Sequence, residues 1–411
     1  MIALKPLPIR DSPEYRQLLL RGQATQDSVR DAVSETVRLV RTGGDAAVRQ
    51  LTERFDRVRL QGSRVPIADC KTALDGLDGR LRGALEQAAE RIDLVHRAQE
   101  FREEPVEAMP AIQVWREWRP FRRVGLYAPG GRTVYPSTVL MMAIPARIAG
   151  CSEIVLCSPP QHDGRIAPAI LAAAALAGAT EVHAVGGAQA IAAMAYGTES
   201  LARVDKIFGP GNAYVTEAKR QVFGEVAIDM PAGPSELLVI SDGSARPEWL
   251  AADLRAQTEH SPDAIAILLT TSKDETQLLR SIPAGQVTAL RCASIDDAVA
   301  FANDFAPEHL SLACADPERW LPQIRSAGSI FIGAQTPAAA GDYATGANHV
   351  LPTGGAARSF GPLGLAAFGR ALQVQRVDRE GIAAVAAVVD VLANAEALPW
   401  HAASVQLRTT G

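Results

Sequence analysis

Residues 124–148 read VGLYAPGGRTVYPSTVLMMAIPARI, and this stretch decides the class of fold. A short apolar run at 124–126 is followed by a glycine-rich turn at 127–131 and then by a longer apolar segment at 137–148. We interpret these three parts as a strand, a tight turn and a helix, because apolar segments of these lengths separated by glycine are typical of a βα unit. The same order repeats along the chain, which predicts parallel sheets with helices on both faces.

The alternation forms two series. In the first we expect strands at 124–126, 154–156, 182–185, 206–208 and 237–240, and helices at 137–148, 167–177, 188–195 and 213–222. In the second we expect strands at 264–270, 287–290, 310–313 and 329–332, and helices near 248–256, 274–280, 295–303 and 317–326. The sequence therefore predicts an α/β fold with two doubly wound, Rossmann-like parallel-sheet units.

The flanking regions are expected to be mainly helical. Helices at 31–41 and 45–55 are separated by Gly43 and Gly44, a longer helix covers 81–101, and 114–118 looks like a strand. A helical tail is expected over 379–408, in which Pro399 should begin a helix rather than sit inside one. We divide the chain into five parts: an N-terminal arm (1–22), a helical part that packs with the second α/β unit (23–120), the first α/β unit (121–234), the second (235–365) and the helical tail (366–411).

Composition limits the class of protein. The 411 residues carry a formal net charge of -5 with 21% charged residues and no basic run, so nucleic acid is not an expected partner. No apolar stretch of about 18 residues is free of charge, and the first residues lack the long apolar region of a signal peptide, so we expect no membrane span and a cytoplasmic location. Five scattered cysteines without a CxxC motif indicate neither a cysteine zinc site nor a disulfide framework.

Four of the seven histidines lie among polar residues in the C-terminal half: His260, His309, His349 and His401. A chain that is 47% hydrophobic buries such groups only where they are paired, bound to metal or used in chemistry. Gln257 and His260 are three residues apart at the end of an expected helix, so both side chains can face one metal ion. A polar helix end is the alternative interpretation.

Glu308 and His309 are neighbours in the chain. Neighbours point apart in a regular helix or strand, so both can address one substrate only from a loop or the end of an element. A glutamate beside a histidine suits two proton transfers at different stages, whereas a strand start with one exposed acid is the alternative. The glycine-punctuated segment 341–355 carries Asp342 and His349, and it is either a functional loop or an ordinary long connection.

Three glycine-rich turns each follow an expected strand and open a helix: YAPGG (127–131), VGGAQ (185–189) and FGPGN (208–212). In an open α/β sheet the ligand crevice lies at these carboxyl ends, where helix N-termini favour anions. None of the turns matches GxGxxG. The pattern indicates either a nucleotide site of unusual form or merely three tight βα turns, which need glycine in any case.

Taken together, these residues resemble the histidinol dehydrogenase family over about residues 30–408. The most specific segments are KIFGPGNAYV (206–215) and IDMPAGPSE (228–236), and AGSIFIG (327–333) and NHVLPT (348–353) follow in the family's order and spacing. The resemblance implies the final steps of histidine biosynthesis: zinc-dependent, NAD-linked, four-electron oxidation of L-histidinol to L-histidine through L-histidinal. It also implies one zinc ion per site and two NAD.

The resemblance further implies a role for individual residues. The zinc ligands would be Gln257, His260, Asp342 and His401. The bases would be Glu308 and His309, with His309 serving the alcohol and Glu308 the water that hydrates the aldehyde. The NAD contacts would be Tyr127, Gln189 and Asn212. The substrate would contact the four zinc ligands together with Ser235, His309, His349 and Glu396.

The resemblance also implies a homodimer whose C-terminal tail reaches the other subunit's site, so that Glu396 and His401 act across the interface. The first α/β unit would then bind the nucleotide, the second would carry the zinc and catalytic residues, and the tail would form the dimer. Two alternatives remain. A zinc hydrolase would also use a glutamate beside a metal, but it needs no dinucleotide crevice. A related dehydrogenase would oxidise another polar alcohol, but Glu396 favours an imidazole that can donate a hydrogen bond.

Overall fold

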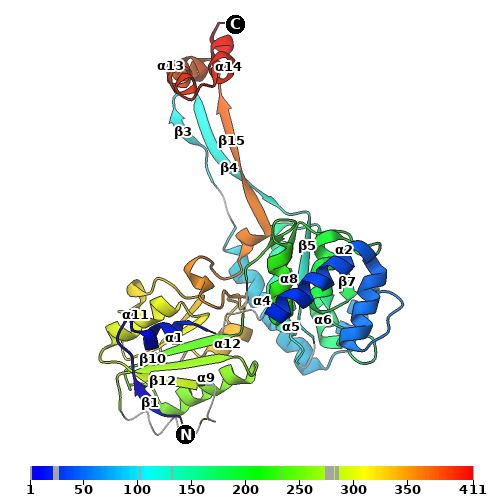
Figure 1. Ribbon diagram of the computed structural model, residues 1–411, viewed down its shortest axis with the longest axis vertical. Coiled ribbons are helices and arrows are strands. Elements are labelled where there is room, and N and C mark those ends of the chain that lie inside the picture. Colours follow the sequence, from blue (N-terminus) through cyan, green and yellow to red (C-terminus); the bar gives the residue numbers. More distant parts are fainter. Residues whose placement is uncertain are drawn as a thin grey trace. The chain divides into compact units, whose positions relative to one another are not determined.

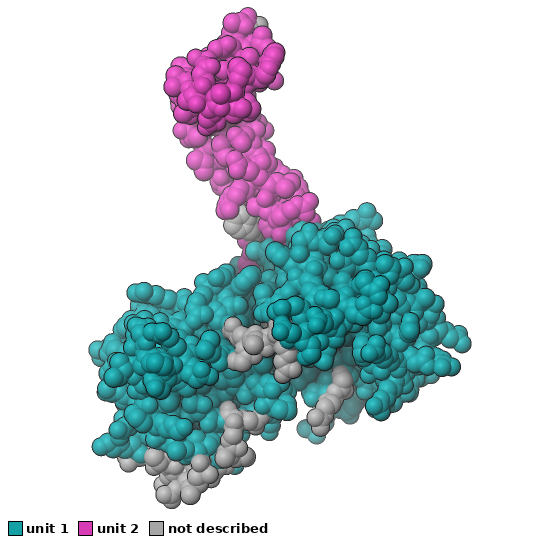
Figure 2. All heavy atoms as spheres, viewed as in Figure 1, with its two compact units in different colours: residues 1–98, 121–368 teal, residues 99–120, 369–411 magenta. Residues whose placement is uncertain are grey.

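The computed structural model describes residues 2–21, 27–100, 103–130, 133–231, 233–273, 282 and 287–410. These fall into two compact units, coloured separately in Figure 2. Unit 1 comprises Met1–Ala98 and Phe121–Phe368, and unit 2 comprises Gln99–Pro120 and Gly369–Gly411. The expected helix at 274–280 lies outside the described residues.

Unit 1 contains two six-stranded sheets. The first has the order β2-β7-β6-β5-β8-β9, and its neighbours pair in parallel except for β2, which pairs antiparallel with β7. The strands are β2 (Arg64–Val65), β7 (Glu181–Ala184), β6 (Glu153–Ser158), β5 (Arg123–Tyr127), β8 (Lys206–Phe208) and β9 (Ala227–Ile228). The four strands expected between 124 and 208 are therefore confirmed.

Helices cover both faces of this sheet (Figure 1). One set that packs together is α3 (Ile67–Asp75), α4 (Gly79–Arg97), α5 (Pro136–Ala149) and α6 (Pro168–Ala177). The other set is α2 (Asp27–Asp56), α7 (Gly187–Tyr196) and α8 (Ala213–Val222). Helix α5 is buried along most of its length, which explains why its sequence is apolar all round rather than amphipathic.

Helices α2 and α3 lie in the part expected to pack with the second α/β unit, but they pack against helices of the first unit. Val33, Val40 and Leu51 of α2 lie in one buried cluster with Ile191 and Met194 of α7. The apolar period of α2 tells which of its faces is buried, but it does not tell which neighbour covers that face. The expected break is confirmed, because Gly44 interrupts α2 with φ 50° and ψ -137°.

The second sheet is wholly parallel, with the order β1-β12-β11-β10-β13-β14. Its strands are β1 (Leu4–Pro6), β12 (Val287–Arg291), β11 (Ile265–Thr270), β10 (Glu236–Ser241), β13 (His309–Ala313) and β14 (Ser329–Ile332). Helices α1 (Pro13–Leu19) and α11 (Ile295–Phe305) share one core cluster, whereas α9 (Pro247–Glu259) and α12 (Ala338–Tyr343) pack with the other. The fold is α/β with two doubly wound parallel sheets, as the sequence predicts.

Two local expectations in this region need correction. The N-terminal arm contributes strand β1, which the sequence did not indicate. The helix expected at 317–326 is only a short 3₁₀ turn, η1 (Leu321–Gln323), because Pro322 lacks the amide hydrogen that a continuing α-helix requires. Two further 3₁₀ turns are η2 (Ala356–Arg358) and η3 (Leu365–Phe368).

Unit 2 consists of an antiparallel sheet and two helices. The sheet has the order β15-β4-β3, from β15 (Gly369–Val377), β4 (Ile112–Pro120) and β3 (Val106–Met109). Helices α13 (Arg379–Ala395) and α14 (Pro399–Thr409) pack on each other. The tail is thus not helical throughout, because β15 is held by a partner strand far away in sequence. Pro399 begins α14, as expected.

All five cysteines are buried and free. In the described part of the chain, no helix is both long and apolar enough to cross a membrane.

Candidate active site

The acidic and imidazole groups of unit 1 gather where β10 and β13 begin. These strands pair in parallel, with Leu237 opposite His309, so Glu236 and Glu308 lie side by side just ahead of that pair. Glu308 Oε2 accepts a hydrogen bond from the Glu236 amide at 2.7 Å, and the Glu308 amide donates to Glu236 Oε2 at 3.2 Å. Each carboxylate therefore fixes the backbone of the other, and Glu308 is buried rather than exposed at a strand start.

One guanidinium faces this acidic pair. Arg21 Nε lies 3.3 Å from Glu236 Oε1, and the guanidinium lies over the Phe305 ring, 3.4 Å from its centroid. Burial raises the pKa of Glu236 to about 7, although Arg21 opposes that rise. Sequence analysis missed both residues: Glu236 stood inside the IDMPAGPSE motif, but nothing in the sequence marked Arg21.

His309 lies between two carboxylates. Its Nδ1 is 3.0 Å from the Glu236 carbonyl oxygen and 3.4 Å from Glu308 Oε2, and its Nε2 is 3.5 Å from Asp342 Oδ1. Burial alone would lower the pKa of His309, but the charges of Glu308 and Asp342 outweigh burial and raise it to about 10. In this arrangement the imidazole holds a proton.

Asp342, at the end of α12, faces three imidazoles. Burial would raise the pKa of Asp342, but His309 and the charges of His349 and His260 outweigh burial and lower it. His349 Nδ1 donates to the Asp342 carbonyl oxygen at 2.9 Å, which leaves Nε2 to accept from Thr138 Oγ1 at 3.2 Å. Burial lowers the pKa of His349.

Gln257 and His260 come from the end of α9, where the sequence placed them. Gln257 is 4% exposed, and its Nε2 has no hydrogen-bond partner among the described residues, whereas His309 Nε2 has its ion-pair contact with Asp342. Buried polar atoms without a partner are rare and call for a bound group. Within the described ranges, no three or more His, Cys, Asp or Glu side chains are grouped so that they could hold a metal ion.

The three residues expected to contact the nucleotide follow strands of the first sheet. Tyr127 ends β5, and its hydroxyl accepts from the Gly187 amide at 3.1 Å; burial raises the pKa of Tyr127 to about 12. Gln189 is 1% exposed in the first turn of α7. Asn212 is exposed and caps α8, where its Oδ1 accepts from two backbone amides at 3.1 Å.

One glycine in these turns cannot be replaced. Gly209 has φ +123°, and a Cβ added there would lie 2.1 Å from the Tyr127 carbonyl oxygen. Only glycine permits that conformation and that close approach. The turn after β8 is thus packed directly on the end of β5.

The remaining expected residues lie in different places. Ser235 is half-buried and immediately precedes β10. Glu396 follows α13 and His401 lies in α14, so both belong to unit 2, where they are exposed. Unit 1 therefore brings Glu308, His309, Asp342 and His349 together, whereas Glu396 and His401 are carried by the other unit.

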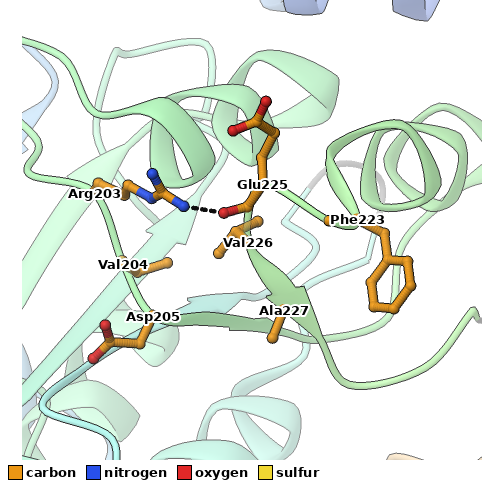
Figure 3. Close-up of a pocket in the computed structure, with 8 residues that line it drawn as sticks. Arg203, Val204, Asp205, Phe223, Glu225, Val226 and Ala227 are labelled. Carbon is orange, nitrogen blue, oxygen red and sulfur yellow. Dashed lines mark hydrogen bonds between the residues drawn. The ribbon is translucent and has the colours of Figure 1, made fainter. Parts of the chain in front are cut away.

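The pocket in Figure 3 does not belong to this site. It is lined by residues 203–205, which precede β8, and by residues 223–227, which lead into the start of β9; Arg203 donates a hydrogen bond to the Glu225 carbonyl oxygen there. It therefore lies at the amino edge of the first sheet, opposite the edge that carries the glycine turns.

Comparison with known proteins gives a consistent answer. The family model of histidinol dehydrogenase matches residues 19–409. The chain belongs to the histidinol dehydrogenase family. It is accordingly an oxidoreductase, and the family resemblance seen in the sequence is confirmed.

Individual members of the family are similar over nearly the whole chain. The histidinol dehydrogenase of Xanthomonas euvesicatoria pv. vesicatoria is 47% identical over 404 residues, 94% of each chain. That of Xylella fastidiosa is 46% identical over 413 residues, 96% of each chain. The crystal structure of histidinol dehydrogenase from Elizabethkingia anophelis has a TM-score of 0.93 and 38% identity, and the match covers 100% of this chain and 98% of that one.

Proposed function

We propose that this protein oxidises L-histidinol to L-histidine through L-histidinal, with NAD as hydride acceptor and one zinc ion in each site. The observation that carries the proposal is the buried arrangement of Glu308, His309 and Asp342 in a chain of the histidinol dehydrogenase family. An imidazole and a carboxylate in contact offer two separate proton acceptors, as successive oxidations of an alcohol and a hydrated aldehyde require.

The side chains present fit a zinc ion. Gln257, His260 and Asp342, with His401 contributed by a second copy of the chain, would form a nitrogen and oxygen ligand set that suits zinc in a catalytic site. The lowered pKa of Asp342 keeps its carboxylate ionised and able to bind a cation, and the side-chain oxygen of Gln257 is the atom that would bind zinc. When bound, zinc would polarise and orient the substrate.

The proton balance assigns one role to each base. In the first oxidation His309 takes the hydroxyl proton of the alcohol while the carbon gives its hydride to NAD. Water then adds to the aldehyde and Glu308 takes a proton from it, and the hydrate gives a second hydride to a second NAD to leave the acid. His309 can accept a proton only when it is neutral, so this assignment requires the combined effect of Glu308 and Asp342 on the pKa of His309 to be weaker when substrate and zinc are bound.

The nucleotide would lie along the carboxyl edge of the first sheet. Tyr127, Gln189 and Asn212 would contact it there, and the glycine turns would let backbone amides approach its phosphates. A direct link joins this edge to the substrate residues, because Thr138, in the first turn of α5 after β5, bonds His349. His349 and Ser235 would contact the substrate.

A homodimer with shared sites is the proposed assembly. Unit 2 exposes large apolar side chains: Val391 is 67% exposed, Trp400 82% and Leu407 70%. Such a surface is typical of a region covered by another chain. Glu396 and His401 of one copy would complete the site of the other, with Glu396 accepting a hydrogen bond from the substrate's imidazole.

The dimer proposal is testable with two inactive variants. His260→Ala and His401→Ala, folded together, should restore activity, because one site of each mixed dimer collects both defects and the other collects none. Random pairing of equal amounts should recover roughly a quarter of all sites. A verified mixed dimer without activity would show that His401 does not serve another copy.

The reaction itself is tested by its stoichiometry. Purified enzyme with zinc and L-histidinol should form two NADH for each histidinol consumed, followed at the NADH absorbance and by chromatography of histidine. A zinc hydrolase would form no NADH, and an enzyme for another alcohol would leave histidinol unchanged.

A further inference from the structure

An acidic side chain that the proposed reaction does not use lies beside the proposed nucleotide residues. Asp56 is the last residue of α2, and Gln189 Nε2 donates to its Oδ2 at 3.4 Å. The Gln189 side-chain oxygen is turned the other way, over Gly187, where an added Cβ would lie 2.7 Å from it. The amide of Gln189 is therefore held between Gly187 and Asp56.

Burial separates the roles of these two side chains. Gln189 is 1% exposed, whereas Asp56 keeps part of its surface open to solvent. A ligand that arrives at this edge of the sheet would meet the carboxylate before it meets the amide. Gln189, which is proposed to contact the nucleotide, thus also orients Asp56.

The electrostatic setting of Asp56 is unfavourable without a ligand. It stands at the C-terminal end of a helix, where the helix dipole disfavours an acid. Among the described residues, no basic side chain forms an ion pair with it, and burial raises its pKa to about 6. An acid held at such a position is typical of a binding site rather than of a stabilising contact.

The strand order places Asp56 far from the reacting groups. Gln189 follows β7, which is two strands away from β5, or about 10 Å across the sheet. Thr138, which bonds His349, follows β5. If the nicotinamide lies near β5 and the catalytic residues, the other end of the dinucleotide extends towards β7, where Asp56 lies.

We propose that Asp56 accepts hydrogen bonds from the hydroxyls of the adenosine ribose and thereby makes the enzyme select NAD over NADP. The inference rests on the proposed function, since it assumes a dinucleotide at this edge. A carboxylate binds the vicinal ribose hydroxyls and repels the additional 2′-phosphate of NADP by like charge. Gln189 is then a positioning residue for this carboxylate.

The test compares the binding of NADH and NADPH by calorimetry, with no histidinol present. Wild-type enzyme should prefer NADH, and Asp56→Asn should narrow that preference by about 10- to 100-fold, the range of a hydrogen bond to a charged group. Glu53→Gln is the matched control, because Glu53 is an exposed acid of the same helix in an ion pair with Arg59. The control should keep the wild-type preference.

An unchanged preference in folded Asp56→Asn would overturn the inference. If that variant does not fold, wild-type enzyme supplies the answer: NADH whose adenosine ribose lacks the 2′-hydroxyl should bind about tenfold more weakly, and equal binding would overturn the inference. Failure of the proposed reaction is a separate result, because it would appear as no NADH formation from histidinol while the nucleotide preference persists.

Discussion

The two sheets of unit 1 gather their candidate functional residues at opposite edges. In the first, the glycine turns and Asn212 stand at the carboxyl ends of the strands, where backbone amides would face the proposed nucleotide. In the second, Glu236, Glu308 and His309 stand at the amino ends of β10 and β13. Because α9 runs back to the start of its sheet, it returns Gln257 and His260 towards that same amino edge. The rule that ligands bind at the carboxyl ends of the strands in an open α/β sheet therefore fits the first sheet but not the second.

The two edges also differ in what they present. The second sheet presents buried charged side chains, whereas the turn after β8 in the first sheet presents backbone and has a charged pair packed behind it. Lys219 Nζ donates to the Gly209 carbonyl oxygen at 2.9 Å, and Asp229 Oδ2 accepts from the Gly209 amide at 2.8 Å. Lys219 and Asp229 form an ion pair that is almost wholly buried. In the proposed function, one edge would carry the reacting groups and the other would hold the nucleotide.

The largest effects should follow from changes at the amino edge of the second sheet. His260→Ala or Asp342→Ala should give folded protein with little zinc and no measurable histidinol oxidation, because loss of one ligand removes much of the affinity of a site. Zinc content by atomic emission and circular dichroism would check this. Full zinc occupancy in either variant would remove that residue from the ligand set.

Glu308→Gln tests whether the two bases of this edge divide the work. Oxidation of supplied L-histidinal should fall by about a hundredfold to ten-thousandfold, the range of a general base, while the alcohol half-reaction is less impaired. Single-turnover measurement of each half-reaction is the readout, with His309→Gln as the reciprocal variant. Equal losses on both half-reactions would contradict separate roles for the bases.

Lys219→Met tests how much the buried Lys219–Asp229 ion pair, which packs behind the turn after β8, contributes to stability. Removing one member of a buried ion pair leaves the other uncompensated, so the free energy of unfolding should fall by about 3–5 kcal/mol in urea titration. Arg59→Met, which removes a member of the exposed pair with Glu53, should change it by no more than about 1 kcal/mol. A similar fall in the free energy of unfolding in both variants would mean that the buried Lys219 pair contributes no more to stability than the exposed Arg59 pair.

The smallest effect is expected from unit 2. Glu396→Gln should raise the KM for histidinol by about tenfold, since an unpaired buried partner costs about 1–3 kcal/mol, and it should leave the zinc content unchanged. Steady-state kinetics with saturating NAD is the measurement. Unaltered histidinol kinetics would show that the imidazole is recognised by other residues.

The sequence could predict those features that depend only on residues close together in the chain. The turns that open α5, α7 and α8, the break at Gly44 and the start of α14 at Pro399 follow from glycine, proline and apolar period alone. The fold class follows from the same alternation. For the candidate site, the motifs supplied the histidines and acids, which the structure gathers where β10 and β13 start.

Features that depend on distant partners could not be predicted. Strand β15 has a mostly exposed, polar sequence and exists because it pairs with β4. Helix α2 packs against α7, and the apolar period of α2 in the sequence does not show which neighbour it will meet. Arg21 reaches the site only because the chain returns beside β10, and the exchange of hydrogen bonds between Glu236 and Glu308 requires the register of two strands.

The pairing of β4 with β15 also bears on how the protein is made. Ile112 lies opposite Val377 and Pro120 opposite Gly369, so β4 leaves the ribosome long before its main partner. Domains generally fold as units during synthesis, N-terminal parts first, but loop closure over so long a segment makes this sheet slow to form. The two α/β sheets can therefore form while β4 is still without its partner β15, and unit 2 assembles last. A protease pulse during translation would find residues 103–120 open to cleavage until the C-terminal segment emerges.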